Sequence, residues 1–127
     1  MFTAEPPPRF PTWQALQFIA DQVGIPYEPA GQDWEYTAAD PEHIDTYLKI
    51  YEDPHSTDDV RFAVMEMLLQ AFEDVEGFAS DTRWTRATAW LRDNHALHAY
   101  TIWYWSALEA ESIEDAWNIS PYMRLLL

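Results

Sequence analysis

The chain has 127 residues, 48% of them apolar and 16% aromatic, with 22 acidic against 7 basic side chains and a net charge of −15. This length fits one domain, and the apolar fraction argues against a disordered chain. The absence of cysteine excludes disulfides, thiolate catalysis and cysteine-based zinc or iron–sulfur sites. The negative charge predicts repulsion from nucleic acids and anionic membranes, and attraction to basic partners.

The N-terminal sequence, MFTAEPPPRF, has neither the basic region nor the apolar region of a secretory signal. No run of about 18 apolar residues occurs, so we expect no membrane-spanning helix and a cytoplasmic, soluble protein. Four of the nine prolines fall within residues 1–11. We therefore predict a proline-rich tail over 1–11 and a single helical domain over 12–127.

Helix signals begin at Thr12, an N-cap candidate, and Gly24 closes the first predicted helix after Val23. Prolines and a glycine then indicate a long loop. Asp40 followed by Pro41 is a strong helix start, and the next helix is expected to end near residue 51.

The clearest helical period lies between Ser56 and Val75. Its apolar arc covers more than half of the helix circumference, which predicts a central helix at about 57–75 that is packed on two sides. Arg61 projects into this arc. We expect its stem to lie along apolar surface with the guanidinium reaching water; the alternative is a buried arginine paired with a carboxylate.

A further helix is predicted from Ser80 or Asp81 to about Asp93. Its arginines are expected to pair with the acidic helices, and holding an anion is the alternative. Residues 95–110 are apolar nearly all round and predict a buried helix, with a strand at 100–105 as the alternative. Short helical turns follow after Ser112 and Ser120. The predicted fold is thus one compact all-α bundle of five or six helices.

Two constellations could carry catalytic chemistry. His95 and His98 are three residues apart and could bind zinc or iron with a neighbouring carboxylate, although the usual Glu-x-x-His and His-x-x-x-His spacings are missing. Glu66, Glu73 and Asp74 share the polar strip of the central helix and could act as acid and base. We favour packed histidines and a solvated strip, and predict no catalytic residue, metal site or cofactor.

The most acidic segment, Glu28 to Asp59, holds ten acids and one base, Lys49. It also holds tyrosines and a tryptophan, the residues that most often anchor interfaces. The alternative is that these aromatics face the core. We predict a partner-binding site in this segment, formed by Glu28, Asp33, Trp34, Glu35, Tyr36, Asp45, Glu52, Asp53, Asp58 and Asp59.

These features predict a non-enzymatic acidic protein that binds a basic protein partner, most sharply an inhibitor of the immunity or antitoxin type. No stretch matches a family motif, and the protein resembles bacterial immunity proteins in type only, as a small acidic helical chain without cysteine. The alternatives are a nucleic-acid mimic, a small metal-dependent enzyme using His95 and His98, and a homo-oligomeric structural protein. A homodimer is compatible with each.

Overall fold

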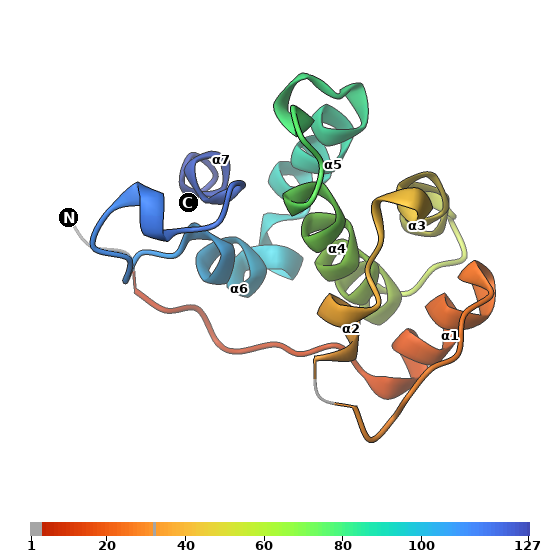
Figure 1. Cartoon of the computed structure of the whole chain (residues 1–127). Coiled ribbons are helices and arrows are strands. Elements are labelled where there is room, and N and C mark those ends of the chain that lie inside the picture. Colours follow the sequence, from red (N-terminus) through yellow and green to blue (C-terminus); the bar gives the residue numbers. More distant parts are fainter. Residues whose placement is uncertain (1–3, 32) are drawn as a thin grey trace. The chain divides into compact units, whose positions relative to one another are not determined.

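The computed structural model describes residues 4–31 and 33–127, without the side chain of residue 113. These residues are all-helical and form no strand, which confirms the predicted fold class (Figure 1). The described residues contain α1 (Trp13–Val23), α2 (Trp34–Thr37), α3 (Ile44–Glu52), α4 (Asp58–Glu73), α5 (Thr82–Asp93), α6 (His95–Ser106) and α7 (Ser120–Arg124). Short 3₁₀ turns lie at Pro41–His43, Phe78–Ser80 and Ile113–Asp115.

The chain divides into two compact units. Residues 10–87 form one, called here the α4 unit, and residues 88–127 form the other, the α6 unit, together with the described N-terminal residues 4–9. The boundary falls inside the sequence of α5. The predicted tail at 1–11 and domain at 12–127 stay predictions, and residues 1–3 of that tail lie outside the described residues.

Helix α4 is the centre of its unit. It packs against α1, α2 and α3, and every residue from Phe62 to Leu69 is buried, as are Ala71 and Phe72. Burial on consecutive positions means that the middle of the helix is covered on all sides, which goes beyond the two-sided packing that its wide apolar arc predicts. The Thr57 hydroxyl accepts the Val60 N–H at 3.2 Å and caps its start.

The predicted helix ends agree with the structure in most places. The Thr12 hydroxyl caps α1 by accepting the Ala15 N–H at 3.2 Å, and Gly24 ends this helix with φ 83°. The Asp40 carboxylate accepts the Glu42 N–H at 2.8 Å, which starts a 3₁₀ turn ahead of α3. Each case follows the rule that side-chain oxygens satisfy the first N–H groups of a helix.

Two local predictions were wrong. The loop predicted after Gly24 contains the single turn α2, which starts at Asp33 in the left-handed conformation with φ 58°. Helix α4 ends at Glu73, two residues before the predicted end. Gly77, with φ 75°, precedes the Phe78–Ser80 turn. Neither a one-turn helix nor the conformation of an isolated glycine has a strong sequence signal.

The guanidinium of Arg61 donates to two backbone carbonyls, a contact that neither sequence interpretation included. Its Nε donates to the Tyr51 carbonyl at 3.0 Å, and its Nη2 donates to the Asp53 carbonyl at 2.8 Å. These carbonyls lie at the C-terminal end of α3, where the helix has no N–H groups left to satisfy them. Arg61 therefore ties the end of α3 to the first turn of α4.

We expect Arg61→Met to destabilise the protein by about 2 kcal/mol, because two carbonyls lose charge-assisted hydrogen bonds while the apolar stem is kept. Urea unfolding followed by circular dichroism measures this loss. The matched control is Arg92→Met, the same change at an exposed position of α5. Equal losses for the two variants would contradict the assigned role of Arg61.

In the α6 unit, α6 packs on α7. The Ser120 hydroxyl donates to the Trp105 carbonyl at 2.7 Å, and Arg124 donates from Nε to the Ser106 carbonyl and from Nη2 to the Ala107 carbonyl, each at 2.7 Å. The C-terminal end of α6 is therefore fixed by α7, since its last carbonyls are satisfied by α7 side chains.

The expectation of a helix buried on all sides at 95–110 was too strong. Helix α6 ends at Ser106, and Ala107 takes the left-handed conformation with φ 49°. One face is buried, with His98 and Trp105 at 1% exposure or less, but Tyr104 is 37% exposed. Although the sequence of α6 is apolar nearly all round, one aromatic face of this helix is open to solvent.

Candidate functional site

The aromatic members of the predicted binding segment face inward. Trp34 is only 6% exposed and contacts the Tyr27 ring edge-on, with centroids 5.0 Å apart. Tyr36 is half-buried and donates its hydroxyl proton to Glu66 Oε2 at 3.0 Å. Tyr47 and Tyr51 of α3 are buried as well. Trp34, Tyr47 and Tyr51 belong to the core of the α4 unit and Tyr36 is partly buried, so the exposed charge of this segment comes mainly from its carboxylates.

Glu66 corrects the prediction of a solvated acidic strip on α4. Its side chain is 4% exposed and receives the Tyr36 hydroxyl, whereas Glu73 is half-buried and Asp74 is exposed. A buried carboxylate needs hydrogen-bond donors, and Tyr36 is one such donor. Glu66 therefore links α2 to α4, and the structure does not bring the three acids into one shared environment.

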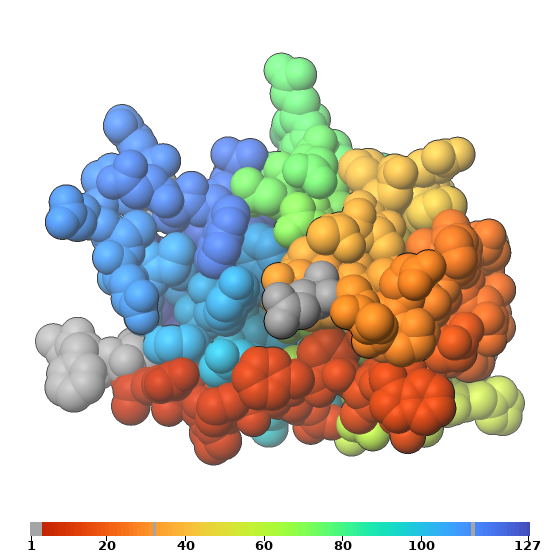
Figure 2. All heavy atoms as spheres, turned by 60° about the horizontal axis from the view of Figure 1, so that its bottom comes forward, coloured from red at the N-terminus to blue at the C-terminus, as the bar shows by residue number. Residues whose placement is uncertain are grey.

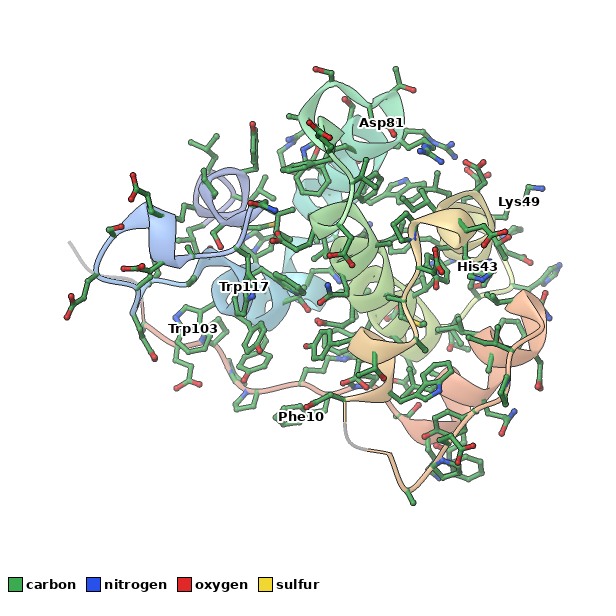
Figure 3. All side chains as sticks on the ribbon, viewed as in Figure 1. Phe10, His43, Lys49, Asp81, Trp103 and Trp117 are labelled. Carbon is green, nitrogen blue, oxygen red and sulfur yellow. The ribbon has the colours of Figure 1, made fainter. Side chains whose placement is uncertain are left out.

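Two of the arginines of α5, Arg83 and Arg86, pair with carboxylates of the α4 unit, as predicted. Arg83 lies 2.8 Å from Asp81 and 3.2 Å from Asp45, and Arg86 lies 2.6 Å from Glu52. The guanidinium of Arg83 donates hydrogen bonds to Asp81 and lowers the pKa of that carboxyl group. Asp81 stands at the start of α5 (Figure 3). Two predicted site residues, Asp45 and Glu52, are thus partly neutralised within the protein.

The α4 unit keeps a large excess of negative charge despite these pairs. Residues 10–87 contain sixteen acidic and four basic side chains. Even if each basic group fully neutralised one acid, twelve carboxylates would remain without a cationic partner in this unit. Glu28, Asp33, Asp53 and Asp58 are exposed, so much of this charge lies where a partner can reach it.

Glu35 is the predicted site residue whose titration departs from the usual range. Partial burial raises its pKa, and the neighbouring Asp33 adds to the rise, while a backbone hydrogen bond opposes it. A carboxyl group with a raised pKa loses its charge earlier on acidification than one with an ordinary pKa. The attraction of Glu35 for a basic partner therefore weakens as the pH falls.

The exposed aromatics of the α4 unit lie on and before α1, where the sequence interpretation had not placed a site. Phe10 is 69% exposed, Trp13 60% and Phe18 42%. Phe18 also lines a groove of about 460 Å³ between α1 and the start of α4. Its lining residues are Thr12, Gln14, Ala15, Phe18, Thr57, Asp59 and Val60.

Figure 2 shows the residues at the start of α1, coloured red-orange, at the lower right of the face turned to the viewer. The yellow-green residues that lead into α4 lie beside them on that face. A helical-wheel signal for this exposure exists, because Phe18 is about 200° around the helix from the buried Leu16. The apolar spacing of α1 therefore leaves Phe18 outside the buried stripe.

The two histidines considered as metal ligands, His95 and His98, both lie on α6. His95 Nε2 donates to the Leu126 carbonyl at 3.2 Å, and His98 is fully buried in α6. Burial lowers the pKa of His98 to about 4, with smaller contributions from the charges of Arg9 and His95. Across residues 4–31 and 33–127, no group of three His, Cys, Asp or Glu side chains is placed to hold a metal ion.

No protein-family model, curated protein or solved structure matches this chain. In the described part of the chain, every helix is too short or too polar to reach across a bilayer.

Proposed function

We propose that the protein is a non-enzymatic binding protein whose α4 unit holds a basic segment of a protein partner. The observation that carries this proposal is the excess of carboxylates over basic groups in residues 10–87, together with a groove on the same unit that is lined by the exposed Phe18. The sharpest form remains a stoichiometric inhibitor of the immunity or antitoxin type acting in the cytoplasm. The nucleic-acid mimic, the metal-dependent enzyme and the homodimer stay predictions.

The groove between α1 and α4 suits a segment that carries both apolar and basic side chains. Phe18 and Val60 offer apolar surface, and Asp59 lies on the same wall. A lysine or arginine can lay its methylene stem along such surface while its charged end meets a carboxylate. An amphipathic basic helix presents both kinds of group along one side, which is a common mode of peptide recognition.

The surplus negative charge of the α4 unit is expected to act mainly on the rate of association with the partner. The surplus carboxylates of this unit produce a field that attracts a basic partner before contact, which raises the association rate at low salt. Phe18 and the neighbouring aromatics then retain the partner, because buried rings carry a large share of binding energy at interfaces. The two contributions respond differently to salt and to substitution, so they can be measured separately.

The test uses the full chain and a synthetic amphipathic helix of about 18 lysines and leucines, titrated by tryptophan fluorescence. We expect Phe18→Ala to weaken binding by roughly tenfold, as expected for an interface anchor. The pair Asp58→Lys and Asp59→Lys should weaken it at least as much at low salt. The matched control is the pair Glu111→Lys and Glu114→Lys, an equal change of charge in the α6 unit.

Equal loss in the control pair, together with no effect of Phe18→Ala, would mean unspecific attraction to a negative protein. That outcome would overturn the proposal, as would the absence of saturable binding to the wild-type chain at low salt. Circular dichroism spectra of all variants establish that each one is folded before its binding is compared.

A further inference from the structure

The α6 unit contains a second cavity, of about 360 Å³, which lies within the size range of small-molecule pockets. Helix α6 supplies one wall, the segment that follows it supplies another, and the N-terminal segment closes it at Glu5. Figure 3 shows Trp103 on the side of α6 along which the N-terminal segment runs. The residues that give the pocket its chemistry are Glu5, Tyr100, Trp103, Tyr104, Leu108 and Glu109.

Three aromatic rings from α6 gather on this wall. The Tyr100 and Trp103 rings are stacked with centroids 5.7 Å apart, and Tyr104 lies 6.5 Å from Tyr100. Tyr104 also stacks on the Trp117 ring, with centroids 5.2 Å apart. The aromatic wall is therefore braced by packing within its own unit, and it remains accessible because Tyr104 is 37% exposed.

The negative charge of the pocket lining favours a positively charged ligand. Glu5 and Glu109 are both exposed members of the lining, and none of the described lining residues is basic. Aromatic faces carry negative electrostatic potential and attract cations, most strongly when the ring is tryptophan. Anions are disfavoured by both features, whereas a cation with an apolar surface is favoured by both.

The end of α6 is also fixed before any ligand arrives. Arg124 satisfies the Ser106 and Ala107 carbonyls, and Ala107 holds the left-handed conformation that turns the chain toward Leu108 and Glu109. A wall that is fixed in this way loses little conformational entropy on binding. We propose that this pocket binds the trimethylammonium group of a small organic cation or of a methylated lysine side chain.

This assignment is independent of the partner proposed for the α4 unit, because it uses only residues of the α6 unit. The methyl groups contact the rings of Tyr100, Trp103 and Tyr104 and the side chain of Leu108. The positive charge is balanced by Glu5 and Glu109 at the rim. The recognised feature is a diffuse charge spread over methyl groups, which a bare ammonium ion lacks.

The test is a titration of the full chain with choline, followed by tryptophan fluorescence and calorimetry. We expect saturable binding with a dissociation constant on the order of 1 mM. The neutral isostere 3,3-dimethylbutan-1-ol has the same shape without charge and should bind roughly tenfold more weakly, because it lacks the cation–π attraction. Ethanolamine, which has the charge without the methyl groups, should also bind more weakly.

Two variants locate the site. Trp103→Leu should weaken choline binding by roughly tenfold, and Glu109→Gln should weaken it several-fold. The matched controls are Trp13→Leu, an exposed tryptophan of the other unit, and Glu111→Gln, an exposed acid outside the pocket lining. Glu109→Gln keeps the side-chain size, so it remains informative if Trp103→Leu does not fold.

A peptide containing trimethyl-lysine distinguishes the two sources of the cation. Tighter binding of this peptide than of choline identifies a protein side chain as the ligand, and the reverse identifies a free quaternary ammonium compound. Equal affinity for choline and its neutral isostere would overturn the assignment. So would the absence of saturation, or choline binding that neither pocket variant weakens.

Discussion

Phe72→Ala is expected to remove about 3–5 kcal/mol of unfolding free energy, the usual cost of deleting a buried phenylalanine ring. Phe72 is fully buried on α4 and contacts the Trp84 ring edge-on, with centroids 5.3 Å apart. Trp84 in turn contacts Phe78 at 4.9 Å. This loss is a large share of the total stability, because single domains are stable by only about 5–15 kcal/mol.

Urea unfolding monitored by circular dichroism gives this free energy. Phe18→Ala is the matched control, because the same side chain is 42% exposed there and its removal should cost clearly less than that of the fully buried Phe72. Phe18→Ala is also the binding variant, so it must stay folded for that test. A cost below about 1 kcal/mol for Phe72→Ala would contradict a core organised around α4.

Acidification is expected to destabilise the α6 unit through His98. This side chain is fully buried, and burial lowers its pKa from 6.5 to about 4. Between these values the unfolded chain binds one more proton than the folded chain, so stability falls as pH falls. The contribution is fully present above pH 6.5, and about 2 kcal/mol of it is lost by pH 5.

The comparison of wild type with His98→Gln isolates this contribution from the titration of the many carboxylates. We expect the difference in unfolding free energy between pH 7.5 and pH 5 to shrink in the variant. His55→Gln, at an exposed histidine, is the control. An NMR titration gives a second readout, in which the His98 ring should stay neutral well below pH 6. A ring that becomes charged near pH 6.5 in the folded protein would contradict this account.

Much of the fold follows from local signals that the sequence carries openly. Thr12 and Gly24 mark the ends of α1 because capping and left-handed glycine have few alternatives at those places. The wide apolar arc of α4 indicates a helix packed on two sides, and the structure buries this arc together with Glu66 of the polar strip. The pairing of Arg83 and Arg86 with nearby acids was also predictable, since acids greatly outnumber bases.

The sequence did not predict which face of a helix packs against which neighbouring helix. Trp34 and Tyr36 lie in the most acidic segment, yet both turn inward because α2 packs on α4. Glu66 has the spacing of a polar strip but is buried beneath α2. Arg61 serves the carbonyls of α3, a contact that depends on the crossing of two helices. Such details need tertiary structure, because sequence periodicity gives the face and not its neighbour.

For the exposed aromatics, too, the sequence predicts less than the structure shows. The periodicity of α1 leaves Phe18 outside the buried stripe, but nothing local predicts the groove that it forms with Thr57 and Val60. The aromatic pocket of the α6 unit likewise needs Glu5, which is about a hundred residues away from Trp103 in the sequence. Both sites combine segments that only the folded chain brings together.

The central claim is that surplus carboxylate on the α4 unit draws in a basic partner. The most direct test is the association rate constant with the lysine–leucine helix, measured by stopped-flow fluorescence between about 20 and 300 mM salt. We predict a fall of at least roughly tenfold over this range, because screening removes the long-range attraction. A rate constant that is independent of salt would contradict the account.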